Sequence, residues 1–537
     1  MAIFSSLWRT DLVALAGLVV VLGRLYMRYR GSGVRTTKLP GPSPCRNILF
    51  GAFAQMSTSP NQSLLFDDWV KEYGTAFSLP MGLGYKDVVI ADVKAAIHFL
   101  ARDTLSYHQT PFAKVLIEML FGPGILWAEE DNHRRQRKAL TPAFSNAALR
   151  GYIPVFYDSV YKLKTTWESI LESGETTIEV QNWMNNIALD NLGIAGFGYN
   201  FHCLDGDKPA VVDVFDAFES PEKSGYLSSA IFFLTPVFPA LARLPTKASN
   251  TFRSTKTSMK PIAEGLIERM KNEMSLVEDK QTEKSIIGLL IKAETASSGL
   301  MLSGDEILAQ VRWMNTLFFA GYETTSTTLT WALIELARNP EKQERLRSEL
   351  AEFSGTDPTW EQLTLGLPYL NAVTQETLRC HPPVPEIARV AMQDDVIPLS
   401  SPVTTAAGEV ITELIIAKGT VVHCPIGQIN QSDELWGADA KEFKPERWVD
   451  RELLPGAKGI QGYHHIMSFS DGPRLCIGRN FALGNFKATL SVLVRNFSFE
   501  LPGGVDTPIG IYKGILPRPR VESEEGPRVP LKIRRLD

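Results

Sequence analysis

The chain has 537 residues, of which 44% are hydrophobic and 21% charged, with 40 glycines and 33 prolines, and this composition excludes a disordered or collagen-like protein. The formal net charge of -5 provides no global basic field, so we predict no nucleic-acid partner. Five scattered cysteines are too few for a disulfide framework and favour a reducing compartment; they are Cys45, Cys203, Cys380, Cys424 and Cys476.

Residues 1–30 are predicted to form an N-terminal membrane anchor. Residues 12–23 are an uninterrupted apolar run, and with their flanks they give about 20 residues, enough to span a bilayer if the ends snorkel. Lys and Arg residues are concentrated after this run, so the positive-inside rule places the remainder of the chain in the cytoplasm. A secretory signal peptide and a buried core helix are the alternatives.

Residues 31–45 are predicted to be a hinge, because Gly31-Ser-Gly33 is flexible and Pro40-Gly-Pro-Ser-Pro44 is stiff. The body, residues 46–537, has no repeat. Helical periodicity dominates from about residue 132 to 379, and short strands are expected near 88–91, over 390–422 and from 497 onward. The predicted fold class is mainly α with small β-sheets, an α+β arrangement.

A long helix is predicted from the capping box Ser303-Gly-Asp-Glu306 to Pro340, roughly 50 Å in length. In its middle, Ala320 and Gly321 remove side-chain bulk, so that a flat ligand could lie against the backbone. The Thr324 hydroxyl can compete for the carbonyl of residue 320, and Glu323 would add a proton carrier. A close helix–helix crossing with a solvated glutamate is the alternative.

A second motif is Phe469-Ser-Asp-Gly-Pro-Arg-Leu-Cys476-Ile-Gly478, followed by an amphipathic helix over 480–496. A cysteine ahead of a helix N-terminus and close to Arg474 lies where N–H groups and positive charge favour the thiolate. Gly472 and Gly478 permit tight turns and the close approach of a bulky cofactor. The chain has no Cys-x-x-Cys pair, so zinc and iron–sulfur sites lack ligands.

The spacing of this second motif resembles the haem-binding loop of the cytochrome P-450 family, and Ala-Gly-x-Glu-Thr-Thr resembles the family's oxygen-binding helix. Glu376-Thr-Leu-Arg379 matches the family's Glu-x-x-Arg, and Pro445-Glu-Arg-Trp448 matches its Pro-Glu-Arg-Phe with Trp in place of Phe. His133-Arg-Arg-Gln-Arg137 stands where the family has Trp-x-x-x-Arg, with His in place of Trp. The resemblance covers roughly residues 38 to 530 and implies the cytochrome P-450 fold, with one haem-centred body instead of several domains.

The resemblance also assigns roles to single residues. It implies that Cys476 is the axial iron ligand of haem b, and that Glu323 and Thr324 are catalytic residues that deliver protons to bound dioxygen. Residues implied to bind the haem propionates are His133, Arg137, Arg389 and Arg474. Other implied haem contacts are Phe469, Gly478, Ala320 and Gly321. A buried structural network is implied for Glu376, Arg379 and Arg447.

The implied function is a haem-thiolate monooxygenase that inserts one oxygen atom of O2 into a lipophilic small molecule, in fungal secondary or xenobiotic metabolism. No Gly-x-Gly-x-x-Gly or P-loop motif occurs in the chain. NADPH is therefore expected to act indirectly, through a membrane-bound NADPH–cytochrome P-450 reductase, and the enzyme to lie in the endoplasmic reticulum membrane with a cytosolic catalytic domain. Candidates for the docking face, or for an ordinary solvated face, are Arg134, Arg135, Lys138 and Arg479.

The substrate pocket is expected between residues 112–121, 313–319, 383–387 and 509–516, by alignment with the family's substrate-contact regions. These segments are nearly all apolar, with Glu386 and Tyr512 as polar exceptions, which predicts a lipophilic substrate. Two rival functions remain, a haem-thiolate isomerase or dehydratase without oxygen activation and a non-catalytic haem-binding protein. Neither of them needs the Glu323–Thr324 pair.

Overall fold

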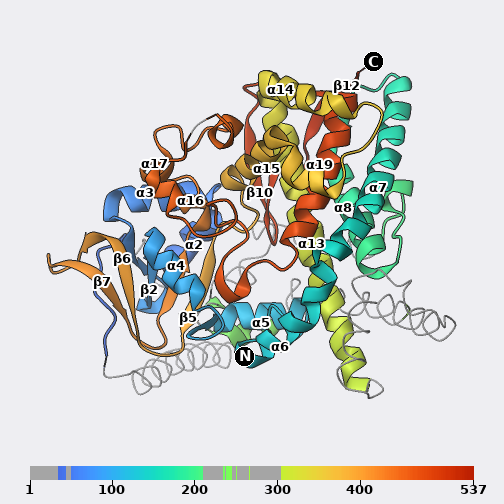
Figure 1. Ribbon diagram of the computed structural model, residues 1–537. Helices are drawn as coiled ribbons and strands as arrows, with labels where there is room; N and C mark the ends of the chain where they lie inside the picture. Colours follow the sequence, from blue (N-terminus) through green and yellow to red (C-terminus); the bar gives the residue numbers. More distant parts are fainter. Residues whose placement is uncertain are drawn as a thin grey trace, which may run out of the picture.

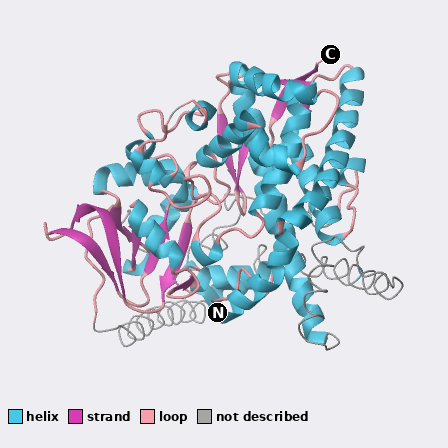
Figure 2. Ribbon diagram, viewed as in Figure 1, coloured by secondary structure: helices cyan, strands magenta, loops and turns pink. Residues whose placement is uncertain are grey.

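The computed structural model describes residues 34–43, 50–209, 234–235, 238–244, 250, 265, 304–450 and 452–536 (Figure 1). Most of the long helices lie on one side of the molecule, and the largest sheet lies on the other with the hairpin β6–β7 (Figure 2). The predicted arrangement, mainly α with small sheets, is confirmed. The predicted anchor, residues 1–30, lies outside the described residues. Within the described part of the chain, no helix has both the length and the apolar character needed to cross a membrane.

Six helices surround the largest hydrophobic core. They are α7 (Asn146–Glu172), α8 (Val180–Phe197), α13 (Gly304–Arg338), α14 (Pro340–Leu350), α15 (Pro368–Cys380) and α19 (Arg479–Asn496). The α13 helix runs through the middle of this group and packs along α8, while α19 packs on α7 and also contacts α13 (Figure 1). The other described helices are α2 (Gly51–Thr58), α3 (Gln62–Tyr73), α4 (Val93–Ala101), α5 (Pro111–Leu120), α6 (Glu130–Leu140), α16 (Ile426–Ile429), α17 (Asp433–Trp436) and α18 (Pro455–Lys458).

The strands of the described residues form four small sheets. The largest has the order β1-β2-β8-β5-β3, and in it only the β2–β8 pair is parallel. Its strands are β1 (Ala76–Pro80), β2 (Lys86–Ile90), β3 (Tyr107–Gln109), β5 (Ile387–Ala391) and β8 (Val421–Cys424). The hairpin beside it consists of β6 (Asp395–Thr404) and β7 (Val410–Ile416). The smaller sheets are β4-β12-β9 (Thr177–Glu179, Pro530–Arg535, Phe497–Glu500) and β10-β11 (Ile509–Lys513, Pro517–Val521). Most of these strands lie in or next to the three regions where the sequence predicts them, but β1, β3 and β4 lie outside those regions, and β4 interrupts the stretch predicted to be helical.

The predicted long helix is confirmed as α13, which begins one residue after Ser303 and ends at Arg338. It ends there because Pro340 disfavours helical geometry in the residue before it and instead occupies the first turn of α14. From Thr316 onward most of its side chains are buried, so the helix crosses the interior of the body. This location puts the Ala320–Thr324 segment in the core.

Residues 34–43, which belong to the predicted hinge, are docked on the body. The Thr37 N–H donates to the Ile415 carbonyl at 2.9 Å, and the Ser78 N–H donates to the Pro40 carbonyl at 2.8 Å. Leu39 is buried, and a Cβ at Gly41 would lie 1.8 Å from the Ser78 oxygen. The described part of the predicted hinge therefore lies against the folded body, and the domain boundaries stay predictions.

Candidate haem-thiolate site

The loop that carries Cys476 is closed by its own backbone. The Cys476 N–H donates to the Phe469 carbonyl at 2.9 Å, and the Phe469 ring packs edge-on against Tyr463. Gly472 has a φ of 64°, and a Cβ there would come within 2.3 Å of the Leu100 oxygen at the end of α4. Only glycine fits this turn. The loop thus presents Cys476 immediately before the N-terminus of α19.

Cys476 differs from the other cysteines that the structure describes, because its side chain is exposed whereas Cys203, Cys380 and Cys424 are buried. Its protein surroundings raise the pKa of the thiol, while the Gly478 N–H and the charges of Arg137 and Arg479 act in the opposite direction. The groups expected to favour the thiolate are present, but desolvation outweighs them.

The middle of α13 has the local geometry that the sequence predicts for Thr324. Its Oγ1 donates to the Ala320 carbonyl at 2.6 Å, four residues back. Ala320 is exposed although the residues before it are buried, so this face of the helix borders open space. Gly321 faces elsewhere, because a Cβ there would meet the Leu192 side chain of α8 at 3.0 Å. The small side chain of Ala320 borders open space, as predicted. The missing side chain of Gly321 instead allows α13 to pack closely on α8, which is the helix crossing given as the alternative interpretation.

Glu323 is buried in an ion pair that the sequence does not reveal. Its Oε1 accepts a hydrogen bond of 2.9 Å from the Nε of Arg518, a residue of β11, and both side chains are almost fully buried. The alternative of a solvated glutamate is therefore wrong. A signal was available in Pro517-Arg-Pro-Arg520, since an arginine within a segment expected near an apolar pocket needs a partner.

Arg474 and Arg389, two of the predicted propionate ligands, converge on Asp103. The Nε atoms of Arg474 and Arg389 lie 3.2 Å and 2.9 Å from Asp103 Oδ1, and Asp103 is completely buried. Arg474 also donates to Glu129 Oε2 at 2.6 Å and to three carbonyls, those of Ile125, Leu126 and Ala128. These bonds engage all five of its N–H groups, so Arg474 ties the loop before α6 to the cysteine loop.

Arg137 is different, because its guanidinium makes no hydrogen bond or ion pair with any residue that the structure describes. Burial lowers its pKa, and the nearness of Cys476 opposes that lowering. His133, one turn away on α6, is buried, and burial together with Arg474 and Arg137 lowers its pKa to about 4, so it is neutral. A desolvated cation beside a neutral imidazole fits an anionic group, such as a carboxylate.

A pocket of about 470 Å³ opens beside Arg137. Its walls come from the residues after α4, from α6 and from the cysteine loop. The lining residues are Thr104, Leu105, Glu130, His133, Arg134, Arg137, Lys138, Thr141 and Pro473.

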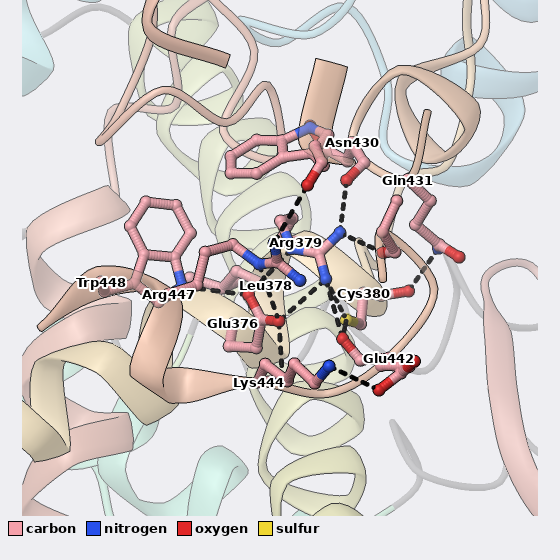
Figure 3. A network of polar contacts seen from close by, with 12 residues as sticks. Glu376, Leu378, Arg379, Cys380, Asn430, Gln431, Glu442, Lys444, Arg447 and Trp448 are labelled. Atoms are coloured by element: carbon pink, nitrogen blue, oxygen red, sulfur yellow. Dashed lines mark hydrogen bonds and ion pairs between the residues drawn. The ribbon is translucent and has the colours of Figure 1, made fainter. Parts of the chain in front are cut away.

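The predicted structural network is present and is centred on Glu376 (Figure 3). Arg379 binds Glu376 through two hydrogen bonds of 2.8 Å, and Arg447 Nε lies 3.5 Å from Glu376 Oε1. The Trp448 indole, which replaces the family's Phe, donates to Glu376 Oε2 at 3.0 Å. Asp439, which the sequence analysis missed, pairs with Arg447 at 2.9 Å.

Two of the predicted pocket segments meet through aromatic rings. Phe121, directly after α5, packs on Phe319 of α13 with ring centroids 4.7 Å apart.

Glu386, an expected polar pocket residue, instead bonds to His423 at 2.5 Å, and His423 also bonds to Asp87 at 2.9 Å. The sequence analysis missed this triad, whose members come from different parts of the chain.

These residues fit a haem with a thiolate ligand. Cys476 is exposed, Ala320 borders open space, and Arg137 is a desolvated cation without a described partner. A Cβ at Gly478 would meet only the Phe144 ring, at 3.8 Å, so the described protein atoms do not require glycine there. A flat cofactor next to the cysteine would require it.

Similarity to known proteins covers almost the whole chain. A family model described as Cytochrome P-450 matches residues 40–521. Cytochrome P-450 monooxygenase claQ of Ampulloclitocybe clavipes is 48% identical over 531 residues, which cover 98% of this chain and 97% of that protein. Monooxygenase claO of the same fungus is 49% identical over 525 residues, 96% of each chain. Ganoderic acid synthetase CYP5150L8 of Ganoderma lucidum is 33% identical over 553 residues, 98% of each.

Proposed function

We propose a role for each residue of the site and a class of substrate, starting from the finding that this chain belongs to the cytochrome P-450 family. The chain is a haem-thiolate monooxygenase. The relatives claQ and claO are named cytochrome P-450 monooxygenases. The balanced reaction is RH + O2 + NADPH + H⁺ giving ROH + H2O + NADP⁺. The single observation that carries our assignment of the site is the exposed Cys476 beside Arg137, whose guanidinium has no partner among the described residues.

Haem held by a cysteine thiolate supplies the activation of O2. In this chain Cys476 would hold the iron and Arg137 would bind a propionate, with neutral His133 beside it. Arg474 and Arg389 already bind Asp103. If they also bind a propionate, they would hold both carboxylates at once. Ala320 and Gly478 would leave room for the plane of the macrocycle, and Phe469 would shape the loop around the sulfur.

Glu323 and Thr324 would move protons. The reaction consumes protons to make water, and a buried site needs side chains to carry them. Thr324 Oγ1 holds its proton toward the Ala320 carbonyl, on the face of α13 that borders open space. Glu323, the preceding residue, has the only carboxylate in the 320–328 segment. We assign to this pair a relay in which Glu323 gives a proton to Thr324 Oγ1 while Thr324 passes on its own hydroxyl proton, and the carboxylate is then reprotonated from solvent.

The substrate we propose is a lipophilic small molecule. The predicted pocket segments are nearly all apolar, which supports this proposal. Glu386, one of their two polar residues, is hydrogen-bonded to His423 and so does not require a polar substrate group. The relative named ganoderic acid synthetase supports a role in fungal secondary metabolism.

Electrons would come from an NADPH–cytochrome P-450 reductase, because the chain has no dinucleotide-binding motif. Arg134 and Lys138 line the pocket beside Arg137 and, with Arg135 and Arg479, are the cations proposed for its docking face. The apolar run at residues 12–23 and the positive charges after it support a single-pass anchor in the endoplasmic reticulum membrane, with the catalytic domain in the cytosol.

The test begins with the reduced carbon monoxide difference spectrum of the full chain. A band at about 450 nm is expected for the wild type and not for Cys476→Ser. Membranes with reductase and NADPH are then given lipophilic candidates under isotopically labelled O2, and one labelled atom is expected in the product. A wild type without the band contradicts the thiolate ligand, and a product oxygen that comes from water contradicts monooxygenation.

A further inference from the structure

The ion pair between Glu323 and Arg518 joins two elements that are far apart in the sequence. Glu323 lies in the middle of α13, and Arg518 lies in β11, 195 residues later. The Nε of Arg518 is 2.9 Å from Glu323 Oε1, and the side chains are 4% and 1% exposed. A bond between two such groups is shielded from water, so it is stronger than an ion pair at the surface.

The hairpin β10–β11 holds this arginine rigidly. Arg518 pairs with Tyr512 across the hairpin, and β11 contacts α13 directly. A Cβ at Gly514, in the turn of the hairpin, would lie 3.9 Å from the same Oε1. The carboxylate of Glu323 is therefore bound to the strand and lies close to the turn, and its position depends on where the hairpin lies.

The bond to Arg518 fixes one of the two oxygens of the Glu323 carboxylate, and either oxygen can carry a proton. Successive residues of an α-helix point about 100° apart, so Glu323 and Thr324 face different directions. The Arg518 Nε–H occupies Oε1 on the hairpin side, whereas Thr324 Oγ1 is directed along the helix to the Ala320 carbonyl. The bond to Arg518 therefore sets the orientation of the carboxyl group relative to Thr324.

We propose that Arg518 is a positioning residue for proton delivery, which holds the Glu323 carboxylate and thereby couples the hairpin β10–β11 to the Glu323–Thr324 pair. This inference rests on the proposed role of Glu323. Residues 509–516 of the hairpin are also expected to contact the substrate, so the molecule that sets the position of the hairpin would also set the position of the proton carrier.

The test needs no organic substrate. With reductase and NADPH alone, O2 is reduced either by one NADPH, in O2 + NADPH + H⁺ giving H2O2 + NADP⁺, or by two, in O2 + 2 NADPH + 2 H⁺ giving 2 H2O + 2 NADP⁺. Hydrogen peroxide formed per NADPH measures how often proton delivery fails. We expect this ratio to rise severalfold in Arg518→Gln and in Glu323→Gln, and the double variant to show no further rise.

The matched control is Arg520→Gln. Arg520 lies in the same strand, and the described structure records no bond between it and Glu323, so its ratio is expected to equal that of the wild type. Hydrogen exchange provides a readout that is independent of turnover. The amides of residues 509–521 are expected to exchange faster in both Glu323→Gln and Arg518→Gln than in Arg520→Gln.

The outcomes separate the inference from the function on which it rests. A wild-type peroxide ratio in Glu323→Gln contradicts the proton role of Glu323 itself. A raised ratio in Glu323→Gln with a wild-type ratio in Arg518→Gln overturns the positioning role alone, and so do additive effects in the double variant. If Arg518→Gln does not accumulate, Arg518→Lys keeps the charge, and an intermediate ratio is expected for it; a wild-type ratio there, with unchanged hairpin exchange, also overturns the positioning role.

Discussion

Trp448 donates a hydrogen bond from its indole Nε1 to Glu376 Oε2 at 3.0 Å, and so becomes a member of the buried charge network. Glu376 is completely buried and also accepts bonds from Arg379 and from the Lys444 N–H. A phenylalanine, the residue usual at this position in the family, has no donor. In this chain the network therefore depends on the tryptophan to satisfy one more lone pair of a buried carboxylate.

Trp448→Phe is expected to destabilise the protein by about 1.5–3 kcal/mol, the range for a hydrogen bond to a charged group. The measurement is the denaturation midpoint, followed together with the carbon monoxide spectrum. Trp167→Phe is the matched control, because the Trp167 indole is buried but its Nε1 has no acceptor among the described residues. That variant loses ring volume without losing a hydrogen bond. A Trp448→Phe midpoint equal to that of the wild type would contradict a stabilising bond.

The fold could be predicted where the signal is local. The sequence signals for the two ends of α13, the capping box that starts at Ser303 and the proline at 340, lie within two residues of those ends. The pairing of β2 with β8 could not be predicted, because Val88 and Val422 are separated by most of the chain and periodicity says nothing about partners at that distance.

In the candidate site, too, contacts between residues close in the sequence could be predicted and contacts between distant residues could not. The Glu376–Arg379 pair lies within one helical turn, so the motif alone predicts the contact. Asp103 and Arg518 were missed because their partners lie 286 and 195 residues away. Both are charged residues within mostly apolar surroundings, and the requirement that a buried charge be paired shows that a partner must exist without showing which one it is.

The variants Arg137→Gln and Arg474→Gln are expected to have different defects, one in haem retention and the other in the loop before α6. Arg137 has no described partner in the protein, so Arg137→Gln should raise the rate of haem transfer to apomyoglobin about tenfold while leaving the loop before α6 unchanged. Arg474→Gln removes the bonds to Asp103 and Glu129, so the amides of residues 125–129 should exchange faster. The measurements are haem transfer and hydrogen exchange on both variants. Faster loop exchange in Arg137→Gln, or unchanged exchange in Arg474→Gln, would refute this division of roles.

The buried triad of Asp87, His423 and Glu386 gives the stability of the protein a pH dependence. Burial alone would lower the pKa of His423, but its hydrogen bonds with Asp87 and Glu386 outweigh burial and raise the pKa from 6.5 to about 10. The folded state thus binds this proton more tightly than the unfolded state. The stabilisation is complete below about pH 6.5 and is lost as the pH rises toward about 10.

Glu386→Gln removes one of the two carboxylates that hold the His423 proton, so the loss of stability above about pH 6.5 should be smaller and should end at a lower pH than in the wild type. The unfolding midpoint, measured from about pH 6 to about pH 10, tests this. Lys487, whose pKa burial lowers to about 8, contributes the opposite slope, but it is the same in both proteins and cancels in the comparison. Glu413→Gln, an exposed carboxylate on β7, is the control and should reproduce the wild-type curve. Superimposable curves for Glu386→Gln and the wild type would show that the triad does not retain the proton.

Thr324 and Thr328 offer a matched pair on α13, because each hydroxyl bonds to the carbonyl four residues back. The Thr324 Oγ1 donates to Ala320 at 2.6 Å, and the Thr328 Oγ1 donates to Thr324 at 2.8 Å. The two variants to alanine remove the same group and the same helix-competing bond, so their structural effects should be similar. They differ in location, because Thr324 lies next to Glu323 and shares its face with the exposed Ala320, whereas Thr328 lies one turn further along.

Thr324→Ala is therefore expected to keep the carbon monoxide spectrum of the wild type and to raise hydrogen peroxide formed per NADPH severalfold, because the variant lacks the hydroxyl that we propose to relay protons from Glu323. Thr324→Ser, which restores the hydroxyl, should return most of the lost coupling. Thr328→Ala should match the wild type in both measurements. If Thr324→Ala and Thr328→Ala give the same peroxide ratio, the effect arises from the helix, and Thr324 has no particular role in proton delivery.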